Sequence, residues 1–360
     1  MARLLLALCL LASLPARADT RLYTFPYDEP PAELLETGFL IPPEEVTVSL
    51  TFAGDCTLGT EHAARGASGG FTQTVLREGM EYPFRELRAF FAEDDATIVN
   101  LEGVLSDRDL RPAIKKYRFI GPTAFVGVLT EGNIECVGMA NNHALDFGSA
   151  GRDDTRAALG QAGIACFDDS YVAVLVKDGV RVGFTGTVFG PGDKQWARTA
   201  RQSEVLRALG CAAWVHTVHM GTEYGKAYHA SQPRMAEWLA AQGVNLVVGC
   251  HPHIVQGVTA VGDMPVAYSL GNCCFGGNAN PPDHDACLLR AVLTFTDSAL
   301  ADTALRLYPI SVSGSAERND YQPRRLSGED AERVLEKMRA MSDLEIGAYT
   351  AEGGASVALP

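Results

Sequence analysis

Hydrophobic positions recur along the chain with two different periods, and the two periods alternate. Runs rich in β-branched residues that stop at a glycine or a polar residue predict strands, and 46–54 is the clearest example. Apolar residues spaced three and four apart predict helices over 149–163 and 230–243, each of which stops at a glycine. The alternation of strands with helices predicts a layered α/β fold.

Further strands and one hairpin follow the same pattern along the chain. The hairpin is predicted over 171–187, where the turn falls on Asp178 and Gly179. The other predicted strands span 96–102, 134–140, 214–219, 244–250, 254–261, 265–270, 286–296 and 303–310, and an amphipathic segment spans 83–94.

Two helix starts carry capping residues. Ser231 is expected to cap the helix that spans 230–243. Ser327, followed by Asp330 three positions later, predicts a capping box that opens a last helix over 328–341. We find no internal repeat in this order of elements, which favours one domain over several.

The simplest organisation is a single domain over 46–341 with a C-terminal tail over 342–360. Residues 19–45 contain five prolines and predict an extended lead-in or linker. Residues 1–18 combine an arginine, a short apolar stretch and a small-x-small end, which predicts a signal peptide and export to the periplasm, cell envelope or medium. A retained anchor is the alternative, although a membrane span needs about 20 apolar residues and no later segment reaches that length.

The charge balance narrows the choice of partners. Hydrophobic residues make up 47% of the 360-residue chain and charged residues 21%, as in a folded globular protein. Cleavage after residue 18 would remove two of 30 basic residues and no acidic one, so 28 basic and 44 acidic residues would remain, a formal charge of −16. Such a surface repels nucleic acid and anionic lipid, so we expect neither as a partner.

Eight cysteines follow the predicted signal peptide, an even number that would suit disulfides in an exported protein. They are Cys56, Cys136, Cys166, Cys211, Cys250, Cys273, Cys274 and Cys287. Several of them lie in or beside apolar strand-like runs, where cysteine acts as a small buried hydrophobic residue. We therefore favour free, buried thiols, with one or two disulfides as the alternative.

Polar residues of the kinds that bind metals collect at the carboxyl ends of the predicted strands. They are Asp55, Asn100, Glu102, Asn142, His143, His216, His219, His251 and His253. Each one alone has an ordinary explanation, for example a turn aspartate, a helix cap or a core histidine. Their recurrence favours a metal site, because burying an uncompensated polar group costs about 2 kcal/mol or more, and a cation is a common partner of carboxylates and imidazoles.

The segment 245–257, NLVVGCHPHIVQG, places two of the eight histidines beside one proline at the end of a predicted buried strand. Pro252 biases His251 toward an extended conformation, in which His251 and His253 project to the same side. Two imidazoles arranged in this way could reach two neighbouring ions.

Six segments together resemble a known family. They are TFAGDCTLG, IVNLEG, GMANNHALDFGSAG, VHTVHMGTEY, NLVVGCHPHIVQGV and VAYSLGNCCF, and they occur in the order and approximate spacing of the CapA/PgsA capsule-synthesis proteins. This family is similar to the calcineurin-like metallophosphoesterases. The resemblance covers 46–341 and implies a four-layer α/β/β/α sandwich with a two-metal site between the sheets.

The resemblance also assigns roles to individual residues. It implies two divalent ions, which could be manganese, iron or zinc. Their ligands would be Asp55, Glu102, Asn142, His219, His251 and His253. His143 resembles the histidine that protonates the leaving oxygen, and Asp146 would orient it. Glu223, Lys116 and Arg118 are candidate contacts to an anionic substrate, with a solvated surface charge as the alternative for each.

Three positions depart from the metallophosphoesterase pattern. Thr57 stands two residues after Asp55, where an imidazole is expected, so one metal would lose a ligand. Glu102 replaces the usual bridging aspartate and reaches further. Cys273 and Cys274 replace apolar residues after YSLGN.

Three functional hypotheses follow from these features. The first is an exported metal-dependent hydrolase that acts on a phosphoester or an anionic cell-envelope polymer such as poly-γ-glutamate. The second is a non-catalytic capsule assembly or export protein that uses the fold to bind polymer or capsule-synthesis membrane partners, which the missing imidazole at Thr57 favours. The third is a cysteine hydrolase that uses Cys250 or Cys273.

Overall fold

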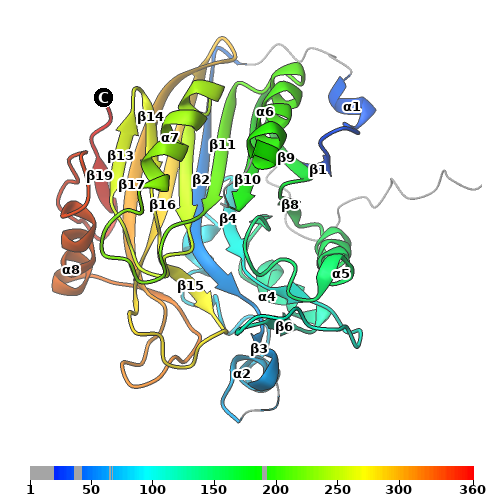
Figure 1. Cartoon of the computed structure of the whole chain (residues 1–360). Coiled ribbons are helices and arrows are strands. Elements are labelled where there is room, and N and C mark those ends of the chain that lie inside the picture. The colour runs from blue at the N-terminus through cyan, green and yellow to red at the C-terminus, as the bar shows by residue number, and fades with distance from the viewer. Residues whose placement is uncertain (1–19, 36–42, 65, 67, 189–192) are drawn as a thin grey trace, which may run out of the picture.

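The computed structural model describes residues 20–35, 43–64, 66, 68–188 and 193–360, so the predicted signal peptide over 1–18 lies outside the described residues. Two large sheets form the centre of the fold (Figure 1). The first sheet has, in spatial order, β1 (Thr20–Pro26), β9 (Tyr171–Lys177), β10 (Val180–Val188), β11 (Ala213–His219), β12 (Leu246–Cys250), β14 (Met264–Ala267) and β13 (Val258–Val261). Strands β10, β11, β12 and β14 run parallel.

The second sheet also has a parallel centre. Its strands, in spatial order, are β18 (Arg324–Arg325), β17 (Ala299–Ser311), β16 (Asp285–Thr296), β2 (Glu45–Thr57), β4 (Ala96–Leu101), β7 (Cys136–Gly138) and β8 (Ala165–Phe167), with β15 (Asn272–Phe275) beside β2 and β19 (Ala355–Val357) beside β17. Strands β2, β4, β7 and β8 run parallel, which brings their carboxyl ends to one edge. A small third sheet joins β3 (Thr60–Glu61), β6 (Phe119–Gly121) and β5 (Val104–Leu105).

The helices lie on the outer faces of the two sheets. The first sheet is covered by α6 (Asp193–Ala208) and α7 (Ser231–Gln242), and the second by α2 (Phe71–Glu78), α3 (Arg88–Phe91), α4 (Val126–Glu131) and α5 (Gly148–Gln161). Buried side chains from both sheets pack together between them, with α8 (Gly328–Arg339) against β16 and β17. These layers confirm the predicted four-layer α/β/β/α sandwich. The short elements α1 (Ala32–Leu35), η1 (His62–Ala64) and η2 (Thr123–Phe125) complete the described part of the chain.

Most predicted elements are present, and the differences lie at their ends. The predicted hairpin is formed by β9 and β10, with positive φ at Asp178 and Gly179 as its turn requires. Ser231 is the first residue of α7 and not its cap, and Ser327 precedes α8 without a side-chain capping bond. Within 83–94 only α3 is an α-helix, and turns form the rest.

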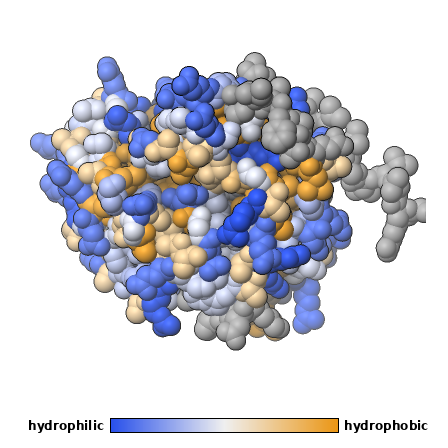
Figure 2. Space-filling model, turned by 90° about the horizontal axis from the view of Figure 1, so that it is seen from above, coloured by the Kyte–Doolittle hydropathy of each residue, from blue (hydrophilic) through white to orange (hydrophobic). Residues whose placement is uncertain are grey.

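Segments outside the predicted domain also join the sheets. Residues 20–26, part of the expected lead-in, form β1 at the edge of the first sheet, where they pair antiparallel with β9. Residues 355–357, in the expected tail, form β19 and pair with β17. None of the helices in the described ranges has the length and hydropathy needed to cross a membrane. Figure 2 shows one face of the molecule, on which hydrophilic residues are interspersed with smaller hydrophobic areas.

Two glycines bring neighbouring backbones unusually close where strands of each sheet end. A Cβ on Gly54, in β2, would lie 1.9 Å from the carbonyl oxygen of Gly271, and a Cβ on Gly249, in β12, would lie 2.1 Å from that of Tyr268. Only glycine fits such contacts without moving a backbone. Asp55 directly follows Gly54, so this tight packing fixes the backbone position of Asp55.

Candidate metal centre

Two carboxylates lie side by side at the end of adjacent parallel strands. Asp55 lies near the end of β2, directly after an irregularity in its pairing with β4, and Glu102 directly follows β4; both side chains are fully buried. Asp55 Oδ1 accepts a hydrogen bond of 2.7 Å from the Asn100 amide, and Asp55 Oδ2 accepts one of 3.0 Å from the backbone N–H of His251. Within the described part of the chain, neither carboxylate oxygen of Glu102 has a hydrogen-bond partner.

Three imidazoles approach these carboxylates from the other sheet. His219 ends β11, and its Nε2 lies 3.6 Å from Glu102 Oε1 and 3.0 Å from Asn142 Oδ1. His253 follows β12, and its Nδ1 lies 3.2 Å from Asp55 Oδ2. The rings of His219 and His251 have centroids 4.6 Å apart. All six predicted metal ligands therefore meet at one place between the sheets.

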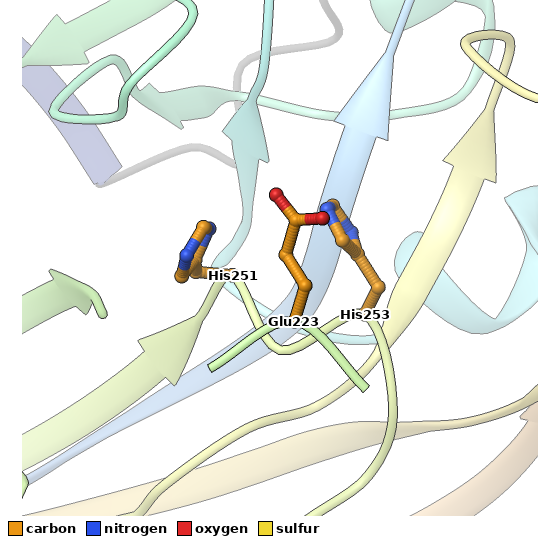
Figure 3. A group of neighbouring side chains, drawn as sticks. All are labelled: Glu223, His251 and His253. Atoms are coloured by element: carbon orange, nitrogen blue, oxygen red, sulfur yellow. The ribbon is translucent and has the colours of Figure 1, made fainter. Parts of the chain in front are cut away.

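The ligand atoms form two overlapping groups, in each of which they lie within 4.8 Å of one another. One group joins Asp55, Glu102 and His253, which are all buried. The other joins exposed Glu223, half-buried His251 and buried His253, and Figure 3 shows the Glu223 carboxylate beside the His253 ring with His251 opposite. A divalent cation fits this set of donors, because neither buried Glu102 oxygen has a hydrogen-bond partner among the described residues.

The histidine-proline-histidine segment has a different backbone from the one expected. His251 has a φ of 100° and His253 a φ of 58°, so the prediction of an extended conformation at His251 is wrong. Positive φ is uncommon for residues other than glycine and costs on the order of 1–3 kcal/mol each. The hydrogen bond from His251 to Asp55 helps to offset this cost, and both imidazoles still face the carboxylates.

Burial and neighbouring charges shift the titration of these groups. Burial and the charge of Asp55 raise the pKa of Glu102 to about 8. Burial also acts to raise the pKa of Asp55, but the hydrogen bond and charge of His253 and the hydrogen bond from Asn100 outweigh it and hold that pKa low. Burial lowers the pKa of His219, which keeps the imidazole neutral, as metal binding requires.

His143 and Asp146 form a pair next to the carboxylates. His143 Nδ1 lies 2.7 Å from Asp146 Oδ2, and its Nε2 lies 3.8 Å from Glu102 Oε1. Asp146 Oδ2 also accepts the backbone N–H of Phe119 at 2.7 Å, and the Phe119 ring stacks on His143 with centroids 4.3 Å apart. These contacts fix the ring so that Nε2 points toward the site.

The three predicted substrate contacts lie in different settings. Glu223 is among the possible metal ligands. Lys116 is exposed, with its ammonium 4.7 Å from the Tyr117 ring centroid, and Arg118 is paired with Glu61 at 3.2 Å. The cation that reaches the site is Lys115, whose Nζ lies 2.5 Å from Asp146 Oδ1.

Sequence reasoning missed three supporting residues. Lys115 Nζ also lies 3.1 Å from His143 Nδ1. The Asn141 side chain donates to Asn100 Oδ1 and accepts the backbone N–H of His143, and Asn272 Oδ1 lies 2.9 Å from His253 Nδ1. Asn141 and Asn272 belong to the motifs NNH and YSLGN, so their position in these motifs was the available signal.

The eight cysteines within the described residues are free thiols, and all of these but Cys211 are buried. Burial raises the pKa of Cys250 and of Cys273 well above the usual range, which leaves both thiols protonated and weak as nucleophiles. The geometry therefore gives the cysteine-hydrolase hypothesis no support.

His216 lies apart from the metal centre, on the opposite face of β11. It is fully buried, with Nδ1 2.6 Å from Thr185 Oγ1, which also accepts the indole N–H of Trp214. Burial lowers its pKa to about 3. His216 is a core histidine and not a ligand.

The low pKa of His216 predicts a defined loss of stability in acid. Below its usual pKa of 6.5, His216 takes up a proton in the unfolded chain but not in the folded protein. The stability that neutral His216 contributes is therefore lost as the pH falls from 6.5 toward 3. The free energy of unfolding should decrease in both wild type and His216→Met when the pH is lowered from 7 to 4. The decrease should be smaller in His216→Met, by on the order of 3 kcal/mol. Urea unfolding at both pH values measures this difference, and His229→Met, at an exposed histidine, should follow wild type.

The layered sandwich, with carboxylates and imidazoles gathered at its strand ends, defines an α/β protein of the metallophosphoesterase-like class. Residues 49–277 match the family described as "Bacterial capsule synthesis protein PGA_cap", and the chain belongs to this family.

Two relatives are similar over much of the chain. "Capsule biosynthesis protein CapA" of Bacillus anthracis is 24% identical over 258 residues, which cover 64% of this chain and 61% of the relative. "PGA biosynthesis protein CapA" of Bacillus subtilis (strain 168) is 24% identical over 251 residues, which cover 63% of each. The matched part of this chain thus spans less than two thirds of either relative.

Proposed function

We propose that this chain is an exported, metal-dependent hydrolase of the phosphoesterase type. Its substrate would be an anionic polymer of the cell envelope or capsule, such as poly-γ-glutamate, as the names of the two relatives suggest. The observation that supports this proposal best is Glu102: its two carboxylate oxygens are buried among ligand-type side chains and have no hydrogen-bond partner in the described residues. Export rests on the signal-peptide pattern of residues 1–18.

The proposed ligands would hold two divalent ions at the strand ends. Such ions, when bound, supply Lewis acidity and a water of lowered pKa. The chain itself supplies Asp55 and Glu102 from the second sheet, and His219, His251 and His253 from the first. On a protein with a strongly negative net charge, cations at this place would favour an anionic substrate.

His143 is placed to move a proton at Nε2. Its Nδ1 is engaged by Asp146 at 2.7 Å, so Nε2 is the nitrogen that faces the site. Burial lowers the pKa of His143, although the hydrogen bond and charge of Asp146 act in the opposite direction. Lys115 and Phe119 hold Asp146 and the ring in position.

The role of His143 gives the test of the hydrolase proposal. His143→Gln should lower hydrolysis of a generic phosphodiester by roughly 10²–10⁴-fold with metal content unchanged, because the proton transfer is lost and the ligands remain. Elemental analysis and a chromogenic phosphodiester assay measure the two quantities. His229→Gln, at an exposed histidine, is the matched control and should keep wild-type activity. Equal rates in wild type and His143→Gln, or a purified protein that binds no divalent metal, would contradict the proposal.

A second candidate function is capsule assembly or export without turnover. It is favoured by Thr57, which is buried and stands where an imidazole ligand is expected. In this role the site would bind polymer, or the protein would bind membrane partners of capsule synthesis. Binding of poly-γ-glutamate that is equal in wild type and His143→Gln, with no hydrolysis by either protein, would favour this candidate over the first.

A further inference from the structure

The loop between β11 and α7 is fixed against the histidine-proline-histidine segment. The backbone N–H of Tyr224 donates to the carbonyl of Pro252 at 2.8 Å, and that of Met220 donates to the carbonyl of Cys250 at 3.0 Å. Further along the loop, the Gln256 side chain donates to the carbonyl of Gly225 at 3.2 Å. The loop is therefore held at both sides of residue 223.

A second set of contacts holds the end of this loop where α7 begins. Gln232 is buried, and its amide donates to Gln256 Oε1 at 2.9 Å, while its Oε1 accepts the backbone N–H of His229 at 2.8 Å. Gly221 has a φ of 123°, and a Cβ there would lie 3.0 Å from Pro252 Cγ. These contacts hold the loop against the segment that carries the two histidines.

This position brings Glu223 to the two imidazoles. One of its carboxylate oxygens lies within 4.8 Å of a ring nitrogen of His251 and of one of His253 (Figure 3). The His251 Nδ1 atom is buried and has no hydrogen-bond partner among the described residues. Glu223 itself is exposed, and in the described part of the chain no hydrogen bond or ion pair occupies its carboxylate.

We propose that Glu223 is a metal ligand, and that the centre consists of two unequal cation sites. The inner site is Asp55 and Glu102 with His219, and the outer site is Glu223 with His251 and His253. This inference rests on the proposed function, because it assigns ligands to the second of its two ions. Glu223 supplies a donor to the outer ion from the loop between β11 and α7.

The two sites differ in charge and in exposure. The inner site has two fully buried carboxylates, whereas the outer site has one carboxylate, on an exposed side chain. Fewer charged donors and greater access to water make binding weaker and faster to exchange. The outer ion is the one that solvent and a large polymeric substrate can reach.

Titration with Mn²⁺ tests this assignment on the full chain after removal of metal with a chelator. Calorimetry should resolve two sites in wild type, with the weaker one lost or weakened by more than about tenfold in Glu223→Gln. Electron paramagnetic resonance should show spin-coupled Mn²⁺ in wild type and only isolated Mn²⁺ in the variant. Glu237→Gln, at an exposed carboxylate on α7, should behave as wild type.

The outcomes separate this inference from the proposed function. If Glu223→Gln binds two ions with wild-type affinities, Glu223 is not a ligand, and the hydrolase proposal stands. If wild type binds one ion and Glu223→Gln binds it equally well, the outer site does not exist. If wild type binds no ion, both proposals fail. Thermal unfolding in chelator should be the same for Glu223→Gln and wild type, because the side chain is exposed.

Discussion

Glu102→Gln is expected to remove tight metal binding and, at the same time, to stabilise the metal-free protein. The variant keeps the size of the side chain but lacks its negative charge, so the inner ion loses one of two carboxylates. We expect affinity at this site to fall by more than about a hundredfold, and hydrolysis to fall with it. Both effects come from the same buried group.

The gain in stability follows from the raised pKa of Glu102. Because this pKa is about 8 in the folded protein and 4.5 in its usual state, folded Glu102 binds more protons than the unfolded chain between these two values. The stability that protonated Glu102 contributes is therefore fully present below pH 4.5 and is lost as pH rises toward 8. A glutamine does not titrate, so the metal-free variant should be more stable than wild type at pH 8 by on the order of 4 kcal/mol.

Denaturant unfolding in chelator at pH 5 and pH 8 measures this effect. The two proteins should differ little at pH 5 and more at pH 8. Repeating the pH 8 measurement with saturating Mn²⁺ should reverse the order, since only wild type gains the full free energy of ion binding. A metal-free Glu102→Gln protein that is less stable than wild type at pH 8 would show that the carboxylate is stabilised by the fold itself.

Gly54→Ala is expected to destabilise the protein by on the order of 3 kcal/mol. The new methyl group would lie 1.9 Å from the carbonyl oxygen of Gly271, and backbone cannot move aside as a flexible side chain can. Relief of this contact would shift β15 away from β2. Asn272, which contacts His253, begins β15, so metal affinity should fall together with stability.

Gly160→Ala is the matched control for this glycine. Gly160 lies in α5, and a Cβ there would have nothing within 4 Å. Alanine should therefore stabilise that helix by about 0.5–1 kcal/mol, the opposite sign to Gly54→Ala. Urea unfolding of both variants measures the two changes. Equal stability of wild type and Gly54→Ala would mean that β15 moves at no cost.

The sequence could predict that the site residues lie close together, because parallel strands end at one edge of a sheet. Asp55 and Glu102 lie at the carboxyl ends of adjacent strands of one sheet, and His219 and His251 lie at those of adjacent strands of the other. A polar residue that comes directly after a buried strand is therefore near its counterparts, whatever the distance along the chain. The family resemblance then predicted that the two sheets pack face to face, which periodicity alone does not determine.

The backbone of His251 and the role of Glu223 could not be predicted in this way. Pro252 has a local preference that favours extended backbone before it, but tertiary contacts, including the hydrogen bond to Asp55, select a positive φ. Glu223 lies in a loop without periodicity, so only the contacts of that loop place it. Lys115 and Lys116 are adjacent in the sequence, and only the fold decides which of the two faces the site.

The site joins the two halves of the sandwich. Asp55 belongs to one sheet and His219 ends a strand of the other, so an ion that binds both residues ties the two layers together at that end. Ion binding would then be part of folding as well as of chemistry. The metal-free chain would lack this tie between the layers, and completion of its tertiary structure would depend on the supply of divalent cations.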